Sequence, residues 1–132
     1  MPSLQKQREI VNKFFELIAA QKFDELLLLC SQDCKTHNPY ITGGMADLTK
    51  AMTAANKEGR AQNPDASFVV RYALVDGNMA AAYTQLLNDK AKPGAGGLRQ
   101  IHLFRFDEEK IVEYWDVTQQ VTPDMPNAGG AF

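Results

Sequence analysis

The clearest hydrophobic pattern in the chain is an alternation of apolar and polar residues on both sides of a short charged cluster near the C-terminus. The runs 100–106 and 111–120 are rich in β-branched and aromatic residues, and residues 107–110 between them read Asp-Glu-Glu-Lys. Strands show such alternation because successive side chains point to opposite faces of a sheet. The segment from Gln100 to Gln120 is therefore predicted to be a β-hairpin.

The register of this hairpin decides which side chains share a face. A turn at residues 108–110 would place Asp107 opposite Ile111, and the pairs that follow would be Phe106 with Val112, Arg105 with Glu113, Phe104 with Tyr114, Leu103 with Trp115, and His102 with Asp116. A slip of one residue would separate the charges of Arg105 and Glu113, so this pair favours the register that sets His102 against Asp116. A two-residue turn at 108–109 is the alternative.

Opposed residues share a face, so this register sorts the hairpin into two chemically different surfaces. One would carry His102, Asp116, Phe104, Phe106, Val112 and Tyr114, and the other Ile101, Leu103, Trp115 and Val117 with the Arg105–Glu113 pair. A His–Asp couple on an apolar face has two interpretations. It is either a buried histidine satisfied by a carboxylate or a general acid/base pair in a poorly solvated site.

The preceding chain has helical periodicity in three places. Apolar residues at three- and four-residue steps predict an amphipathic helix over 5–21, with Ser3 as its N-cap. A second, short helix, enclosed on most sides, is expected over 24–30. A third helix is expected to begin at Asp47, as its N-cap, and to run to about Arg60.

Strands are expected between and after these helices. A short strand is predicted over 33–38, and it leads into a loop because Pro39 pushes the residue before it toward extended geometry. Two longer strands, 68–75 and 79–87, flank Asp-Gly-Asn at 76–78, which is a strong hairpin signal. The glycine-rich stretch 90–97 is expected to be a mobile loop between strands.

This order of elements defines an α+β fold, in which N-terminal helices pack on a strongly curved, mainly antiparallel sheet and enclose a conical pocket. The 132 residues suffice for a single domain spanning 1–132, with an irregular tail from about residue 121. His102 and Asp116 can point into the pocket. The last residue, Phe132, is expected to fray.

The second face of the last hairpin, with Ile101, Leu103, Trp115 and Val117, is too apolar to remain in water, and no helix is left to cover it. A second copy of the chain is the simplest cover, so we expect a homodimer formed sheet to sheet. The alternative is that the C-terminal tail covers Trp115 locally.

Composition narrows the possible partners. The net charge is −2, without a broad basic face, which argues against a nucleic-acid partner. No apolar run has the length of a signal peptide or a membrane span, so we expect a cytoplasmic protein without a membrane partner. Cys30 and Cys34 are expected to be reduced and buried. With His37 nearby a metal site is conceivable, but no CxxC or HExxH spacing occurs, and neither metal nor cofactor is expected.

Four stretches together resemble a known family. They are THNPY at 36–40, VDGNMAA at 75–81, LFRFDEEKIVEYWDVTQQV at 103–121 and NAGGAF at 127–132. They resemble the SnoaL-like polyketide cyclases, whose cystatin-like, cone-shaped α+β fold is shared with ketosteroid isomerase and nuclear transport factor. The resemblance covers nearly the whole chain.

The resemblance implies a mechanism and a set of residues. Such cyclases use an aspartate as general acid/base, near two histidines, to close a ring by intramolecular aldol condensation without metal or cofactor. The aspartate matches Asp116, and the histidines match His102 and His37. Other relatives have an acid where His102 stands and a histidine where Tyr114 stands, so this chain keeps the cyclase-like histidine and has Tyr114 as a possible hydroxyl donor.

The leading hypothesis is a cofactor-free acid/base enzyme acting on a small hydrophobic carbonyl compound, by aldol cyclisation or a related isomerisation. Its candidate catalytic residues are Asp116, His102 and His37, and its candidate substrate contacts are Tyr114, Phe104, Phe106, Tyr40 and Trp115. The alternatives are a non-catalytic binding or sensing module, a dimerisation scaffold with a filled pocket, and an epoxide hydrolase-like enzyme using similar residues.

Overall fold

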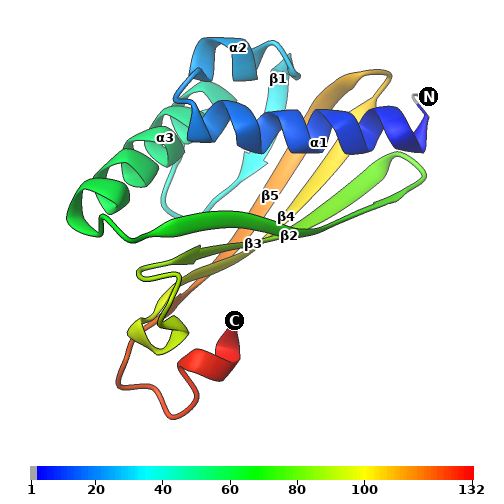
Figure 1. Cartoon of the computed structure of the whole chain (residues 1–132). Coiled ribbons are helices and arrows are strands. Elements are labelled where there is room, and N and C mark those ends of the chain that lie inside the picture. Colours follow the sequence, from blue (N-terminus) through cyan, green and yellow to red (C-terminus); the bar gives the residue numbers. More distant parts are fainter. Residues whose placement is uncertain (1–2) are drawn as a thin grey trace.

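The computed structural model describes residues 3–132 and places three α-helices on one face of a five-stranded sheet (Figure 1). In chain order the elements are α1 (Leu4–Ala19), α2 (Phe23–Leu27), β1 (Cys30–His37), α3 (Met45–Gln62), β2 (Ser67–Asp76), β3 (Met79–Leu87), the short 3-10 helix η1 (Pro93–Ala95), β4 (Gly97–Asp107), β5 (Lys110–Val121) and a second 3-10 helix, η2 (Gly129–Ala131). The α+β prediction is confirmed.

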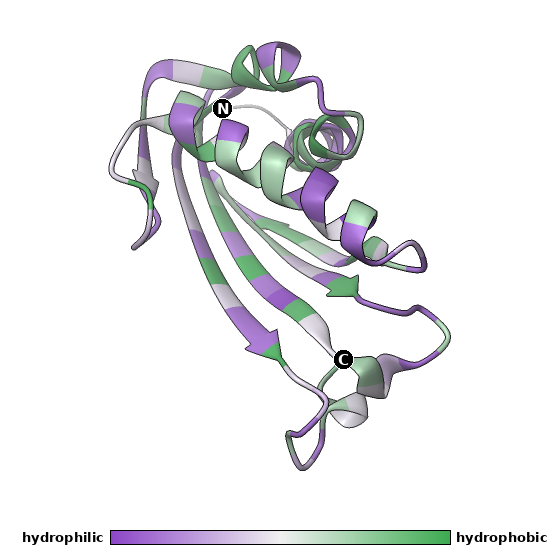
Figure 2. Ribbon diagram, turned by 90° about the vertical axis from the view of Figure 1, so that its left-hand side faces the viewer, coloured by the Kyte–Doolittle hydropathy of each residue, from purple (hydrophilic) through white to green (hydrophobic). Residues whose placement is uncertain are grey.

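The strands follow the order β1-β5-β4-β3-β2 across the sheet. β1 runs parallel to β5, and every other neighbouring pair is antiparallel. Figure 2 shows the strands curving away beneath the helices, so that the sheet has a helix-covered inner face and an open outer face. This is the curved, mainly antiparallel sheet that the sequence predicts.

The β4–β5 register agrees with the prediction from the Arg105–Glu113 pair to the His102–Asp116 pair. Arg105 pairs with Glu113, and the pairing continues to His102 opposite Asp116. The prediction of a three-residue turn was wrong, because Asp107 pairs with Lys110 across a two-residue turn at residues 108–109.

A β-bulge reconciles the short turn with the predicted pairs. Phe106 pairs with Ile111, and Val112 is the extra residue that shifts the register before Glu113. A bulge moves the following side chains to the other face, so Ile111, and not Val112, is fully buried beside Phe106. Glu108 adopts the left-handed φ of 52° that such a tight turn requires.

Helix α1 begins and ends through local hydrogen bonds. The Ser3 hydroxyl accepts the Lys6 amide at 3.0 Å, which confirms the predicted N-cap. At the other end Gln21 has a φ of 59°, and the Lys22 amide donates to the Leu17 carbonyl at 2.9 Å. This Schellman arrangement stops the helix at Ala19, two residues before the predicted end.

The second helix is shorter and less enclosed than expected. α2 ends at Leu27, and although Leu26 is fully buried, the Leu28 side chain is exposed to solvent. Cys30 already belongs to β1, which therefore starts three residues before the predicted strand. Cys30 and Cys34 are both buried free thiols, as expected.

Helix α3 begins before the predicted cap. Gly44 is its N-cap, and Asp47 lies in the first turn. There the carboxylate still faces the positive end of the helix dipole, so the residue was correctly associated with the start of the helix but wrongly assigned as the cap. The helix continues to Gln62, two residues past the predicted end.

The core lies between α1 and the inner face of the sheet. The Phe14 ring is completely buried, with its centroid 5.2 Å from that of Phe104 and 5.5 Å from that of Tyr114. The Phe14–Phe104 pair is edge-to-face, a geometry that adds to the burial energy that holds a helix on a sheet. Phe106 is buried in the same cluster.

The C-terminal tail packs against the body of the protein, so the expected fraying was wrong. Arg99 donates to the Ala131 carbonyl at 2.9 Å, and Phe132 is partly buried. η2 lies beside η1, at the end of the sheet away from the helices (Figure 1). Trp115 has a different neighbour from the tail, because its ring stacks on His37 with centroids 4.9 Å apart.

The outer face of the sheet carries several exposed apolar side chains beside the charged Arg105–Glu113 pair. Ile101, Leu103 and Val117 are all exposed, as are Tyr72 and Leu74 on β2. Among residues 3–132, no helix is both long and apolar enough to cross a membrane.

Gly97 provides a test of the β3–β4 pairing. Its φ is 152°, and an added Cβ atom would lie 1.9 Å from the Leu86 carbonyl oxygen. We expect Gly97→Ala to lower the free energy of unfolding by about 2–4 kcal/mol, because strain and a backbone clash combine.

Gly94 is the matched control, since a Cβ atom there meets nothing within 4 Å. Gly94→Ala should change the free energy of unfolding by less than about 0.5 kcal/mol in the same urea titration. Equal stability of the two variants would contradict the observed packing at Gly97.

Candidate active site

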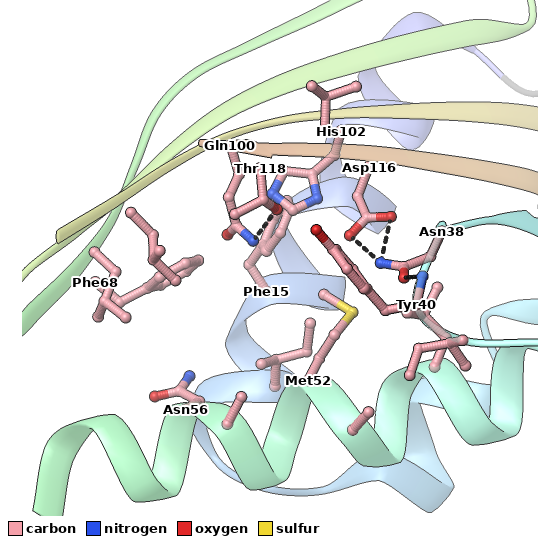
Figure 3. Close-up of a pocket in the computed structure, with 18 of the residues that line it drawn as sticks. Phe15, Asn38, Tyr40, Met52, Asn56, Phe68, Gln100, His102, Asp116 and Thr118 are labelled. Carbon is pink, nitrogen blue, oxygen red and sulfur yellow. Dashed lines mark hydrogen bonds between the residues drawn. The ribbon is translucent and has the colours of Figure 1, made fainter. Parts of the chain in front are cut away.

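A cavity of about 500 Å³ opens between α1, α3 and the inner face of the sheet (Figure 3). Its lining is Phe15, Ile18, Asn38, Pro39, Tyr40, Ile41, Leu48, Ala51, Met52, Ala55, Asn56, Phe68, Leu86, Leu98, Gln100, His102, Asp116, Val117 and Thr118. A concave, mostly apolar space of this size is typical of small-molecule sites. The hypothesis of a scaffold with a filled pocket is therefore wrong.

Asp116 brings the carboxylate into this cavity. It lies on β5 with its side chain on the inner face and is only 9% exposed. The Asn38 amide donates to both carboxylate oxygens, at 3.0 and 2.8 Å. Burial raises the pKa of Asp116, although the Asn38 amide and the Asp116 backbone amide act in the opposite direction. The result is a carboxylate more basic than one in water.

The loop after β1 positions Asn38. The Asn38 side-chain oxygen accepts the Tyr40 backbone amide at 2.8 Å, so the carboxamide is oriented by its own loop. The Thr36 hydroxyl donates to the Gly43 carbonyl at 3.2 Å and closes the same loop. Asn38 was not among the candidate residues, although alternation along the strand that ends at His37 would have placed the next residue on the inner face.

His102 lies opposite Asp116 in the register but makes its hydrogen bonds elsewhere. Its Nδ1 atom is 2.6 Å from the Tyr114 hydroxyl, and its Nε2 atom is 2.9 Å from the Thr84 hydroxyl. Burial lowers the pKa of His102 to about 3. The imidazole is therefore neutral near pH 7, and the two candidate residues share a face without forming a hydrogen-bonded couple.

The hydrogen-bond partners fix the tautomer of His102. The Thr84 hydroxyl donates to the Gln100 side-chain oxygen at 3.3 Å, so it accepts the Nε2 proton of His102. The Nδ1 atom then accepts the proton of the buried Tyr114 hydroxyl, whose pKa is raised by burial. Gln100 in turn donates to the Thr118 hydroxyl at 2.9 Å. A continuous hydrogen-bonded chain thus runs from the core to the cavity wall.

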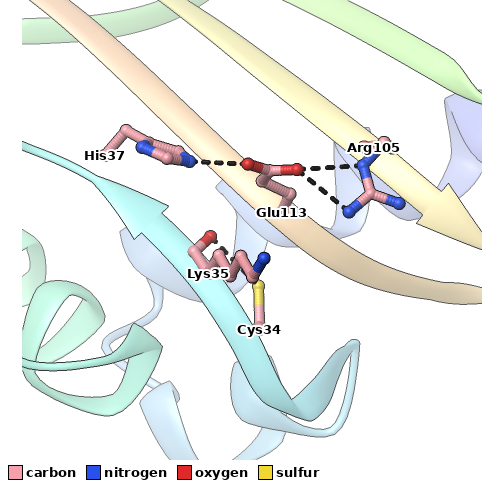
Figure 4. A network of polar contacts seen from close by, with 5 residues as sticks. All are labelled: Cys34, Lys35, His37, Arg105 and Glu113. Carbon is pink, nitrogen blue, oxygen red and sulfur yellow. Dashed lines mark hydrogen bonds and ion pairs between the residues drawn. The ribbon is translucent and has the colours of Figure 1, made fainter.

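His37 does not enter the cavity, contrary to expectation. Its side chain lies on the outer face, 44% exposed, with Nε2 2.7 Å from a carboxylate oxygen of Glu113. The other oxygen of Glu113 accepts from Arg105 (Figure 4). These two partners hold the pKa of Glu113 below its usual value. Trp115 stacks on His37 on this same face, so it does not line the cavity either.

The aromatic candidates divide between core and cavity. Phe104, Phe106 and Tyr114 are buried in the core and do not line the cavity, because α1 packs directly on them. Tyr40 does line it: the residue is 88% exposed at the rim, with its ring directed toward the polar side chains (Figure 3).

The residues that the structure describes contain no group of three or more His, Cys, Asp or Glu side chains that could hold a metal ion. Cys30 and Cys34 are close to each other, but His37 lies beside Glu113.

The fold and the cavity together define a class of protein. It is a small α+β domain in which helices and a curved sheet enclose a mostly apolar cavity with the Asp116 carboxylate in its wall. The model of the SnoaL-like domain matches residues 11–114, and the chain belongs to this family.

Solved structures show the same fold at low sequence identity. AclR from Streptomyces galilaeus, described as a candidate hydroxylase, is 16% identical over 89% of this chain and 81% of its own, with a TM-score of 0.66. A candidate ketosteroid isomerase from Kribbella flavida is 18% identical over 96% and 87%, with a TM-score of 0.66. A loop-truncated variant of IdmH is 16% identical over 86% and 92%, with a TM-score of 0.62. The comparison with curated proteins found no match.

The buried chain of hydrogen bonds predicts the effect of Tyr114→Phe. Removing the hydroxyl leaves the Nδ1 atom of His102 as a buried acceptor without a partner, so we expect a loss of about 1–3 kcal/mol in the free energy of unfolding. Tyr72→Phe, at an exposed tyrosine of β2, is the control and should have little effect. Nitrogen chemical shifts should also report a neutral, Nε2-protonated His102 in the unmodified protein. Equal stability of both variants would contradict the network.

Proposed function

We propose that the protein is a cofactor-independent acid/base enzyme that acts on a small, mostly apolar carbonyl compound. Asp116 is the group that takes up a proton from the carbon next to the carbonyl. The observation that carries the proposal is a carboxylate in an apolar cavity with one side-chain hydrogen-bond donor, Asn38. Weak solvation makes such a carboxylate a better base.

The proton transfer leaves negative charge on the carbonyl oxygen of the substrate. Thr118 supports its stabilisation, because the Thr118 hydroxyl accepts from Gln100 and keeps its own proton for a ligand. The resulting enolate can attack a second carbonyl of the same molecule, which closes a ring by aldol addition. Asp116 then returns the proton to the new alkoxide. Return of the proton to another carbon gives an isomerisation instead.

His102 acts in this mechanism as a neutral positioning residue. A pKa of about 3 keeps its ring neutral near pH 7, and its one N–H proton is already donated to Thr84. Its hydrogen bonds to Tyr114 and Thr84 hold the ring in one orientation beside the cavity. It keeps the wall next to Asp116 dry and rigid, which favours a poorly solvated base.

We expect Asp116→Asn to preserve the fold and to reduce α-proton exchange roughly 10²–10⁴-fold, the usual contribution of a general base. The measurement is NMR-detected deuterium incorporation into a simple ketone, 4-phenylcyclohexanone. With the unmodified protein, exchange should increase as the pH rises through the pKa of Asp116, which lies above 3.8. The deprotonated carboxylate is the active form, and His102 should add no step near pH 6.5.

Asp107→Asn, at an exposed aspartate of the same hairpin, is the matched control and should exchange like the unmodified protein. Full activity of Asp116→Asn would remove Asp116 from the mechanism. Ketone binding without exchange in either protein would favour the binding or sensing module.

We also propose that the outer face forms a homodimer interface. Ile101, Leu103 and Val117 form an exposed apolar strip on β4 and β5, and Val117 is 69% exposed. Such a strip is too apolar to be favourable in water.

Ile101→Glu should therefore convert a dimer into a monomer, because the pairing of two copies would bury the new charges. Light scattering after size exclusion would give the mass of each variant. Leu28→Glu, at an exposed leucine on the helical side, should remain dimeric. A monomeric unmodified protein, or a dimeric Ile101→Glu variant, would refute the interface.

A further inference from the structure

Tyr40 is the most exposed of the aromatic side chains that line the cavity. It is 88% exposed, whereas Phe15 is buried and Phe68 is half-buried. Its ring nevertheless points from the rim into the cavity, with the hydroxyl end toward Asp116 and His102 (Figure 3). An aromatic side chain that faces a cavity with so few contacts of its own has room to pack against a ligand.

The backbone of Tyr40 is held in place although its side chain is not. The Asn38 side-chain oxygen accepts the Tyr40 amide proton at 2.8 Å, which closes an Asx turn, and Pro39 between them restricts the turn further. The same Asn38 amide donates to both oxygens of Asp116. Two hydrogen bonds and one carboxamide group therefore separate the Tyr40 backbone from the carboxylate, a span comparable to the length of a tyrosine side chain.

Few side chains of the cavity wall have a proton free for a ligand. The Asn38 amide is directed at Asp116, and the one N–H proton of His102 is donated away from the cavity. The hydroxyls of Tyr40 and Thr118 differ from these groups, because the part of the chain that the structure describes offers no acceptor for either proton. The exposure of the Tyr40 side chain also leaves its hydroxyl accessible.

We propose that Tyr40 is a catalytic residue whose hydroxyl donates a hydrogen bond to the carbonyl oxygen of the substrate. This role rests on the proposed function, in which Asp116 takes the α proton. As the C–H bond breaks, its electron pair forms the carbon–carbon double bond of the enolate, and negative charge moves to the carbonyl oxygen. The O–H bond of Tyr40 stays intact, and its hydrogen bond strengthens as this charge grows.

Thr118 is the second donor to the same oxygen. It is two residues from Asp116 on β5, so both side chains point to the inner face. Tyr40 comes from the loop after β1, so the two hydroxyls reach the cavity from different elements (Figure 3). Two donors can bind the two lone pairs of one oxygen, and a phenol is a stronger donor than an alcohol because it is more acidic. Loss of the Tyr40 hydroxyl should therefore have a measurable effect even with Thr118 in place.

Tyr40→Phe removes the hydroxyl and keeps the ring. Because the side chain is so exposed, we expect thermal unfolding to be unchanged. Deuterium exchange into 4-phenylcyclohexanone should fall roughly 10²-fold in kcat with little change in KM, the usual effect of removing one oxyanion donor. Tyr72→Phe, at an exposed tyrosine on the outer face, is the matched control and should exchange like the unmodified protein.

Tyr40→Ala separates the role of the hydroxyl from that of the ring. If the ring only covers the ligand, Tyr40→Phe will exchange like the unmodified protein and Tyr40→Ala alone will raise KM, a result that would overturn the proposal. A Tyr40→Phe protein with a raised KM and an unchanged kcat would also overturn it, because the hydroxyl would then contribute equally to binding of the substrate and of the transition state.

Binding of 4-nitrophenol gives a readout that needs no turnover. Its phenolate oxygen resembles that of an enolate, and it absorbs visible light only in this form. Asp116→Asn provides the background, since its neutral amide stands in for the protonated carboxylate. Under mildly alkaline conditions, adding Tyr40→Phe to this variant should raise the Kd of the phenolate roughly tenfold, whereas adding Tyr72→Phe should leave it unchanged.

The two assays keep the two proposals apart. Exchange that depends on Asp116 but not on Tyr40 would support the proposed chemistry and overturn the role of Tyr40. Phenolate binding that depends on Tyr40, without any exchange by the unmodified protein, would support the oxyanion donor and remove Asp116 as the base. A phenolate affinity that Tyr40→Phe does not change, or failure of the phenolate to bind, would overturn the proposal whatever the exchange rate.

Discussion

The pairing of β4 with β5 is the constraint on which the rest of the structure depends. In this register His102 and Asp116 lie on the helix-covered face, while Arg105 and Glu113 lie on the open one. A shift of one residue would exchange the two faces and place charges in the core. The bulge at Val112 allows a tight turn and the correct register to coexist, because it absorbs the odd residue between them.

Burial gives His102 and Asp116, the two titratable residues on the inner face of this hairpin, different roles. His102 is wholly enclosed, and neutral hydrogen bonds satisfy both of its ring nitrogens. Asp116 is at the cavity wall with one amide as its side-chain partner, so its carboxylate remains the reactive group. The same apolar surroundings lower the pKa of the histidine and raise that of the aspartate, because each shift favours the uncharged form.

The sequence was sufficient to predict the fold class, the two long hairpins and the shared face of His102 and Asp116, because all of these depend on period-two alternation and on local turn residues. The sequence was insufficient to predict contacts between residues that lie far apart along the chain. His37 was predicted to enter the cavity, but it lies on the outer face with Glu113, and Asn38 takes the inner position. Alternation along β1 from the buried Cys34 places His37 on the outer face and Asn38 on the inner one. The hydrogen bonds of Asn38 to Asp116 depend on the pairing of β1 with β5, which no local pattern reveals.

The parallel pairing of β1 with β5 has a consequence for how the protein folds. Asn38 and Asp116 are 78 positions apart in the sequence, and parallel strands cannot be joined by a hairpin. Contacts of such high sequence separation require the closure of a long loop, and they form slowly. We therefore expect the two antiparallel hairpins to assemble first and the edge strand to dock last. Until it does, the carboxylate of Asp116 remains hydrated, so the chain acquires its unusual base only in the final step of folding.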